Sequence, residues 1–258
     1  MQVLRLGSSG EDVEHWQHFL RGISLYSAEA HGTFDDQTRL ATQDFQRRHG
    51  LNDDGIVANR TLGEAMRVGF SALHDDPHLP DTLEWPPRPT FPPLDAAGKQ
   101  AAFGQFSFHP APAPGNPEAI QISPGWLEEN IVLATIPQLG RVRGAPSSGR
   151  AQFHRLVAPR VVELFARWQQ AGLDGLMLSY GGSFAPRFIR GSRSVLSQHA
   201  YGSAFDINVE WNPLGAVPAL RGSRGSVREL VPIANELGFY WGGHFARRDG
   251  MHFELGRL

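Results

Sequence analysis

The segment LSQHAYGSAFDIN, residues 196–208, decides how the rest of this chain is interpreted. It places His199 and Asp206 seven positions apart among small residues, and His252 follows near the C-terminus in RRDGMHFEL. Imidazole and carboxylate groups both bind zinc, and a catalytic zinc commonly takes three protein ligands and leaves a fourth position for water. His199, Asp206 and His252 therefore form a candidate metal site. Asp249, three residues before His252, is a carboxylate placed to act on that water without binding the metal.

These positions also match a pattern known from one enzyme family. The pattern S-x-H-x-x-G-x-A-x-D, followed near the C-terminus by an acidic residue, two residues and a histidine, resembles the signature of the D-alanyl-D-alanine carboxypeptidase and L-alanyl-D-glutamate endolysin family of zinc peptidases. The matched residues are Ser197, His199, Gly202, Ala204, Asp206, Asp249 and His252. The resemblance implies an α+β domain, with a small antiparallel sheet and flanking helices as in the hedgehog signalling domain, that hydrolyses peptide bonds with Zn²⁺.

The resemblance further implies a role for each residue near the metal. His199, Asp206 and His252 would bind Zn²⁺, and Asp249 would be the general base that takes a proton from water and returns it to the leaving amine. The family has an arginine after the strand that precedes the histidine motif, where it stabilises the oxyanion. Arg187 and Arg190 are both candidates, and Arg187 is preferred because it follows the Gly-Gly-Ser-Phe turn.

Other side chains near the motifs have open roles. We expect contacts with the substrate or the cleft from Ser197, Gln198, Tyr201, Trp211, Trp241 and His244. A core position is an equally good interpretation for the aromatic residues, and His244 is also an alternative metal ligand. Glu254 follows His252 by two positions, so on a strand it shares a face with that ligand. It is either a carboxylate behind the metal site, an outward charge, or the base in place of Asp249.

Residues 1–70 have the pattern of a small helical domain. Apolar residues recur at helical spacing over residues 13–20, 35–50 and 59–66, which predicts three helices. The second helix is expected to start at Asp35 or Asp36 and to bury Leu40, Ala41 and Phe45. The turns GTFDDQT and GIVANRT, before the second and third helices, form a weak internal repeat.

This pattern, with FQRRHGL at residues 45–51 and DDG at residues 53–55, is similar to the three-helix peptidoglycan-binding domain often fused to cell-wall hydrolases. The resemblance implies peptidoglycan as a partner. The alternative is a generic helical bundle in which the repeated Gly and Thr residues only cap helices.

Residues 71–95 are predicted to be a linker. Proline at the density of DDPHLPDTLEWPPRPTFPPL disfavours helices and central strands, so this stretch is expected to be extended. Residues 96–258 then form the zinc peptidase domain. Within it the apolar pattern predicts a helix over residues 153–168, a buried strand over residues 176–180, a helix with a kink or an early irregular turn at Pro232, and final strands at residues 239–241 and 251–255.

Composition excludes several kinds of function. With 24 Lys+Arg against 26 Asp+Glu, the net charge of -2 favours neither nucleic acid nor an anionic membrane as partner. The absence of cysteine excludes disulfides and thiolate zinc ligands. The N-terminus lacks the pattern of a signal peptide, and no apolar run is long enough to span a bilayer. We therefore expect synthesis in the cytoplasm and action in the periplasm or cell wall after release through a holin.

These features predict a monomeric, phage-type endolysin that hydrolyses peptide bonds in peptidoglycan stem peptides, specifically the bond between L-Ala and D-Glu. A D-Ala-D-Ala carboxypeptidase would use the same residues, and only the shape of its pocket would differ. A non-catalytic cell-wall-binding protein with structural zinc is a third interpretation. Structural zinc sites are normally closed by four protein ligands, so three ligands and an intact Asp249 argue against it.

Overall fold

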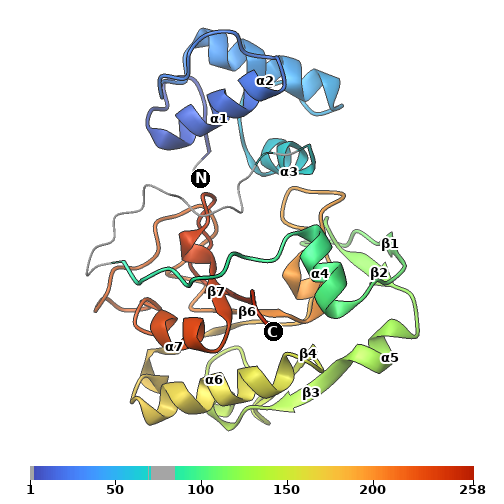
Figure 1. Ribbon diagram of the computed structural model, residues 1–258, viewed down its shortest axis with the longest axis vertical. Helices are drawn as coiled ribbons and strands as arrows, with labels where there is room; N and C mark the ends of the chain where they lie inside the picture. The colour runs from blue at the N-terminus through green and yellow to red at the C-terminus, as the bar shows by residue number, and fades with distance from the viewer. Residues whose placement is uncertain (1–2, 69, 71–84) are drawn as a thin grey trace. The chain divides into compact units, whose positions relative to one another are not determined.

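A computed structural model describes residues 3–68, 70 and 85–258. The chain divides into two compact units, the first comprising Met1–Ala72 and Phe188–Val195, the second Leu73–Arg187 and Leu196–Leu258 (Figure 1). Most of the predicted linker, residues 71–84, lies outside the described residues.

The described part of the first unit contains three helices, α1 (Glu11–Gly22), α2 (Asp36–Arg48) and α3 (Asn59–Arg67). Asp35 caps α2, since its carboxylate accepts a hydrogen bond of 2.8 Å from the backbone N–H of Thr38. The three predicted helices are confirmed. Leu40, however, is 55% exposed. Ala41 and Phe45, four positions apart, define the buried face, and Leu40 is rotated about 100° away from Ala41, so the prediction that Leu40 is buried was wrong.

Gln17 joins α1 to the turn that precedes α2. Its side-chain oxygen accepts hydrogen bonds from the backbone N–H groups of His31 and Gly32, at 2.8 and 3.0 Å. Its amide nitrogen donates to the carbonyl of Thr33 and to the hydroxyl of Thr38, both at 2.9 Å. Gly32 has a φ of +69°, a conformation that favours glycine.

Gln46 makes the equivalent connection from α2 to the turn before α3. Its oxygen accepts from the N–H of Gly55 at 2.8 Å, and its nitrogen donates to the carbonyl of Ile56 and the hydroxyl of Thr61, both at 3.0 Å. Gly55 has a φ of +72°. The internal repeat in the sequence therefore records a repeated structure: a buried glutamine, a turn containing glycine, and a threonine on the next helix.

The second unit opens with α4 (Ala96–Phe103) and two antiparallel strand pairs. These are β1 (Phe108–Pro110) with β2 (Ile120–Ile122), and β3 (Ile131–Thr135) with β4 (Arg150–His154). Helix α5 (Trp126–Asn130) precedes β3, and α6 (Ala158–Gln170) packs against β3 and α7 (Val231–Glu236). The 3₁₀ turns are η1 (Pro137–Arg141), η2 (Asp174–Leu176), η3 (Gln198–Tyr201) and η4 (Gly242–His244).

An antiparallel sheet carries the sequence motifs. Its order, over the described strands, is β5 (Tyr180–Gly182), β6 (Ala204–Ile207), β8 (His252–Leu255), β7 (Phe239–Trp241). Phe205 and Phe253 pair across β6 and β8 and stack with ring centroids 5.5 Å apart, and both contact Trp168 of α6. Because side chains alternate along a strand, the next pair, Asp206 and His252, lies on the opposite face.

Two element predictions in the second unit are corrected. Residues 150–154 pair with β3, so the helix predicted from Phe153 begins at Ala158; Phe153 is buried in a strand whose side chains alternate. The strand predicted over residues 176–180 is η2 followed by β5. Pro232 lies in the first turn of α7, where its missing N–H removes no helical hydrogen bond. Residues 228–230 form turns before the helix, so of the two predicted possibilities the early irregular turn is the one found. The last two strands are confirmed as β7 and β8.

Residues 85–94, assigned from sequence to the linker, pack against the second unit. The Trp85 ring lies 5.7 Å from the Trp241 ring, and the guanidinium of Arg228 lies 4.3 Å from the Trp85 centroid. The carbonyl of Pro87 accepts a hydrogen bond of 2.8 Å from Asn235 of α7. This stretch therefore contributes to the core of the second unit.

Candidate metal centre

A tight turn positions the first histidine of the motif. The hydroxyl of Ser197 caps η3 by accepting a hydrogen bond from the N–H of His199 at 3.3 Å. Gly202 follows η3 with a φ of +67°, and a Cβ at this position would lie 2.7 Å from the backbone nitrogen of His154. Two backbone segments thus approach so closely here that only glycine fits. The chain then enters β6, which carries Asp206.

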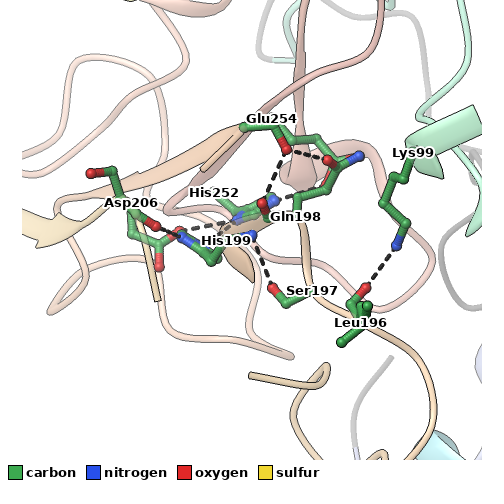
Figure 2. Close-up of polar contacts among 10 residues, drawn as sticks. Lys99, Leu196, Ser197, Gln198, His199, Asp206, His252 and Glu254 are labelled. Carbon is green, nitrogen blue, oxygen red and sulfur yellow. Dashed lines mark hydrogen bonds and ion pairs between the residues drawn. The ribbon is translucent and has the colours of Figure 1, made fainter. Parts of the chain in front are cut away.

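The three predicted ligands converge on one point. His199 Nε2 lies 3.1 Å from His252 Nδ1 and 3.2 Å from Asp206 Oδ1, and His252 Nδ1 lies 3.1 Å from the same oxygen (Figure 2). The two histidines are 3% and 6% exposed. Within the described ranges, these residues form a group whose donor atoms are close enough together to hold one metal ion.

The outer nitrogen of each ring indicates which nitrogen faces the centre. His199 Nδ1 lies 2.6 Å from the carbonyl oxygen of Ser183, and His252 Nε2 lies 2.9 Å from a carboxylate oxygen of Glu254. Both partners are acceptors, so these nitrogens carry protons, and His199 Nε2 and His252 Nδ1 face the centre. Together with Asp206 Oδ1 they would repel one another unless a proton or a metal cation lay among them.

The spacing of these atoms suits zinc. Zinc bonds of about 2.0–2.2 Å in a tetrahedral site separate neighbouring ligand atoms by about 3.3–3.6 Å, close to the observed 3.1–3.2 Å. Two imidazoles and one carboxylate also form a ligand set that zinc uses in catalytic sites. The residues present therefore fit the metal.

The charges at the centre favour a cation. Burial would raise the pKa of Asp206, but the attraction and hydrogen bonds of His199 and His252 outweigh it and hold this pKa well below its usual range. Burial opposes the charged form of His252, but its hydrogen bonds to Asp206 and Glu254 outweigh burial and raise its pKa to about 10. A metal ion that bound at Nδ1 of His252 would take the place of a proton there.

Asp249 lies on the loop between η4 and β8. Its backbone N–H donates to the carbonyl of Gly242 at 2.8 Å, and its carbonyl accepts from the N–H of His252 at 3.0 Å. Its side-chain Oδ1 is buried and has no hydrogen-bond partner among the described residues. Burial raises the pKa of Asp249 to about 6, against the opposing charges of His252, His199 and Arg187. A carboxylate with such a pKa is suited to general base catalysis near neutral pH.

The two candidate arginines lie in different units. Arg187 belongs to the second unit, as do the three ligands and Asp249, and its charge acts on Asp249. Its carbonyl accepts a hydrogen bond of 3.1 Å from the N–H of Ser197. Arg190 lies in the segment Phe188–Val195, which groups with the first unit.

Several residues that were expected to contact the substrate instead contact other residues of the protein. Ser197 is used as the cap of η3, and Gln198, only 4% exposed, donates to Glu254 at 3.4 Å and accepts from the hydroxyl of Ser203. Trp211 is partly buried, with the guanidinium of Arg224 lying 5.6 Å from its ring.

The remaining predicted contacts are buried more deeply. Tyr201 and Trp241 belong to the hydrophobic core of the second unit, and the Trp241 indole donates to the carbonyl of Gly250 at 2.8 Å. His244 is fully buried, its Nε2 lies 2.9 Å from the carbonyl oxygen of Pro86, and burial lowers its pKa to about 4. It is not part of the group that can hold a metal.

Sequence reasoning missed two contributors to the site. Ser183 acts through its backbone carbonyl, which any residue can supply, so its identity carries no signal. Lys99, on α4, is buried and donates to the carbonyl of Leu196 at 2.7 Å (Figure 2). Lys99 lies far from the motif in sequence, and the only signal for it is a lone lysine in the mostly apolar segment AAGKQAAF.

Two regions of the chain match family models. Residues 190–255 match the family described as D-alanyl-D-alanine carboxypeptidase, and residues 9–64 match the family described as putative peptidoglycan binding domain. The C-terminal part of the chain is thus similar to the D-alanyl-D-alanine carboxypeptidase family, and its N-terminal part is similar to a peptidoglycan-binding domain. The predicted family and fold class are confirmed.

Two solved structures are among those similar to the chain. The SleB N-terminal domain is 33% identical over 26% of this chain and 92% of that chain, with a TM-score of 0.26. The endolysin of Burkholderia AP3 phage is 17% identical over 73% of this chain and 68% of that chain, with a TM-score of 0.27. No curated protein matches the chain significantly.

The family matches support a cell-wall-acting enzyme that hydrolyses peptidoglycan, with peptidoglycan as substrate or partner. Across the described residues, every helix is too short or too polar to cross a membrane.

Proposed function

We propose that this chain is a zinc-dependent endopeptidase that cleaves peptidoglycan stem peptides at the bond between L-Ala and D-Glu. The observation that carries the proposal is the convergence of His199, Asp206 and His252 in the same unit as Asp249, whose Oδ1 has no hydrogen-bond partner in the described part of the chain. Three ligands with a base nearby make up a catalytic zinc site, whereas a structural site is normally closed by four protein ligands.

The ligands and the base divide the chemistry between them. His199 Nε2, Asp206 Oδ1 and His252 Nδ1 would hold the zinc ion, which supplies a Lewis acid for the scissile carbonyl and lowers the pKa of water. Asp249 accepts a proton from the attacking water on Oδ1 and delivers it to the nitrogen of the leaving amine. The amine leaves neutral, and Asp249 returns to its ionised form for the next cycle.

Arg187 stabilises the charge that develops on the substrate. Its guanidinium donates to the scissile carbonyl oxygen as that oxygen becomes negative. We prefer Arg187 to Arg190 because its charge acts on Asp249, within the unit that holds the metal ligands. Residues 9–64 would bind peptidoglycan and keep the peptidase domain close to its substrate.

A D-alanyl-D-alanine carboxypeptidase is the second candidate, favoured by the description of the family that residues 190–255 match. The same residues serve both reactions, which differ in whether the pocket accepts a free carboxylate terminus. Mass spectrometry of products from defined muropeptides separates them: an endopeptidase releases the stem peptide beyond L-Ala, whereas a carboxypeptidase removes one D-Ala.

The direct test is hydrolysis of purified peptidoglycan by wild type, His199→Ala and Asp249→Ala, with the metal content of each protein assayed. We expect His199→Ala to lose both zinc and activity, and Asp249→Ala to keep zinc and lose activity. If the wild type binds zinc and releases no peptide, the peptidase proposal is wrong and a zinc-containing binding protein replaces it.

A further inference from the structure

Glu254 is a buried carboxylate on the site face of the sheet that the proposed reaction does not use. It lies on β8, opposite Ala204 of β6, and is 6% exposed. One of its oxygens accepts from His252 Nε2 at 2.9 Å and the other from Gln198 at 3.4 Å. Figure 2 shows the carboxylate between the imidazole and the amide, so both of its oxygens are engaged within the protein.

The surroundings of Glu254 hold it in this position. The Gln198 side-chain oxygen accepts from the hydroxyl of Ser203, which orients the amide so that its N–H groups face Glu254. Lys99 on α4 supplies a buried positive charge: burial lowers the pKa of Lys99, and the attraction of Glu254 opposes this. The Lys99 ammonium is fixed by the carbonyl of Leu196 at 2.7 Å. Burying a carboxylate is costly unless hydrogen bonds and a nearby counter-charge accompany it.

We propose that Glu254 is a positioning residue for the metal ligand His252. By accepting the Nε2–H, it fixes the tautomer and ring orientation that turn Nδ1 towards the ion, and Gln198 and Lys99 keep the carboxylate in place. Hydrogen-bond partners behind a metal-binding imidazole fix its orientation, and losing them typically weakens metal binding. The inference rests on the proposed zinc site and assigns the residues behind its ligands.

The test measures the zinc affinity of the full-length chain by competition with a chromophoric chelator. Three substitutions of Glu254 distinguish the effect of its hydrogen bond to His252 from the effect of its negative charge. Glu254→Gln keeps an acceptor for His252 without the charge, since Gln198 can flip its amide to donate to Ser203 and accept from the new side chain. Glu254→Met keeps the volume without an acceptor. Glu254→Asp keeps the charge but is one methylene too short to reach the imidazole.

We expect Glu254→Met and Glu254→Asp to bind zinc about 10–100-fold more weakly than wild type, and Glu254→Gln to stay within about threefold. Glu236→Ala, which removes a surface carboxylate paired with Arg167, is the control and should bind zinc like the wild type. Chemical denaturation of the metal-free proteins checks folding, and if one of the Met and Asp variants does not fold, the other decides.

Each contrary outcome points to a different error. If the folded Met or Asp variant binds zinc like the wild type, Glu254 does not position His252. If Glu254→Gln is as weak as Glu254→Met, the charge matters and the hydrogen bond does not, which also overturns the inference. If the wild type itself binds no zinc, the proposed metal site is wrong, an outcome distinct from both.

Discussion

Each of the two units buries a polar cluster, and the clusters differ in whether their polar atoms find partners within the chain. In the first unit, the side-chain amides of Gln17 and Gln46 donate and accept hydrogen bonds, and both the nitrogen and the oxygen of each amide have partners within the chain. In the second, His199, Asp206 and His252 turn three ligand atoms towards one another, and Asp249 leaves an oxygen unpaired among the described residues.

This contrast separates a structural cluster from a functional one. Buried polar groups that satisfy one another hold a fold together, because an unpaired group costs about 1–3 kcal/mol. A cluster that stays incomplete needs support from elsewhere, here the Phe205–Phe253 pair on the other face of the sheet. We therefore expect the incomplete cluster to bind a ligand. Substituting its residues should lower activity more than it lowers stability.

The largest expected effect comes from removing a metal ligand. His199→Ala takes away one of three donors, so zinc should be lost and peptidoglycan hydrolysis should fall on the order of 10⁴-fold or more, since zinc lowers the pKa of water by about eight to nine units. Metal analysis and turnover of purified peptidoglycan check this. A variant that keeps both full zinc occupancy and activity would exclude His199 as a ligand.

Asp249→Asn should separate chemistry from metal binding. The amide cannot accept a proton, so kcat should fall about 10²–10⁴-fold, the usual contribution of a general base, while zinc content stays at the wild-type level. Parallel measurement of kcat and bound zinc checks both parts. Full activity in the variant would move the base to another residue, and loss of zinc would make Asp249 part of the metal site.

The sequence predicted the cluster of ligands because the spacing of His199, Gly202 and Asp206 reflects local geometry. A tight turn needs glycine at positive φ, and a strand then brings the aspartate beside its antiparallel partner, His252. The three helices of the first unit were equally accessible, because their periodicity and caps are local signals.

Contacts between distant segments were not accessible in this way. Phe153 fits a helical pattern and a strand pattern equally well, and only pairing with β3 decides between them. Gln198 was expected at the substrate, but whether its amide faces outward or reaches Glu254 depends on the register of β6 and β8. Lys99 reaches the site from a helix outside both family matches, so no local pattern reveals it.

The arginines provide the next largest contrast. Arg187→Ala should lower kcat/KM about 10²–10³-fold, the usual effect of removing one donor to a developing oxyanion. Arg190→Ala should stay within a few-fold of wild type on soluble muropeptide substrates. The pair is measured with zinc-loaded proteins of equal metal content. The reverse order of effects would assign the oxyanion contact to Arg190.

The cluster in the first unit should respond through stability. Gln46→Leu leaves the groups around Gly55, Ile56 and Thr61 without their partner, so the free energy of unfolding of the first unit should fall by about 1–3 kcal/mol or more. Zinc content should not change. Gln37→Leu, at an exposed position of the same helix, is the control and should shift stability by less than about 0.5 kcal/mol. Equal effects of the two substitutions would contradict a structural role for Gln46.

The smallest expected effect is a dependence on pH that has opposite signs for stability and activity. The pKa of Asp249 is about 6 in the metal-free fold and about 4 in an unfolded chain. The folded state therefore binds this proton more tightly, so the stabilisation is complete below pH 4 and is lost as the pH rises through 6. Asp249→Asn removes the effect, and its stability relative to wild type should increase between pH 4 and pH 6 and then level off.

Activity should change in the opposite direction, because the base must be ionised. In the zinc-loaded enzyme kcat/KM should fall tenfold per pH unit below the pKa of Asp249, at or below pH 6, since a bound cation lowers that pKa. Denaturant unfolding of metal-free protein and the pH profile of the loaded enzyme test the two limbs. A constant stability difference between Asp249→Asn and wild type would show that Asp249 is not strained by burial. The expected rise in the relative stability of Asp249→Asn would show that the fold favours the neutral form of Asp249, whereas the reaction needs its charged form. Gln17 and Gln46, which do not ionise, have no such conflict.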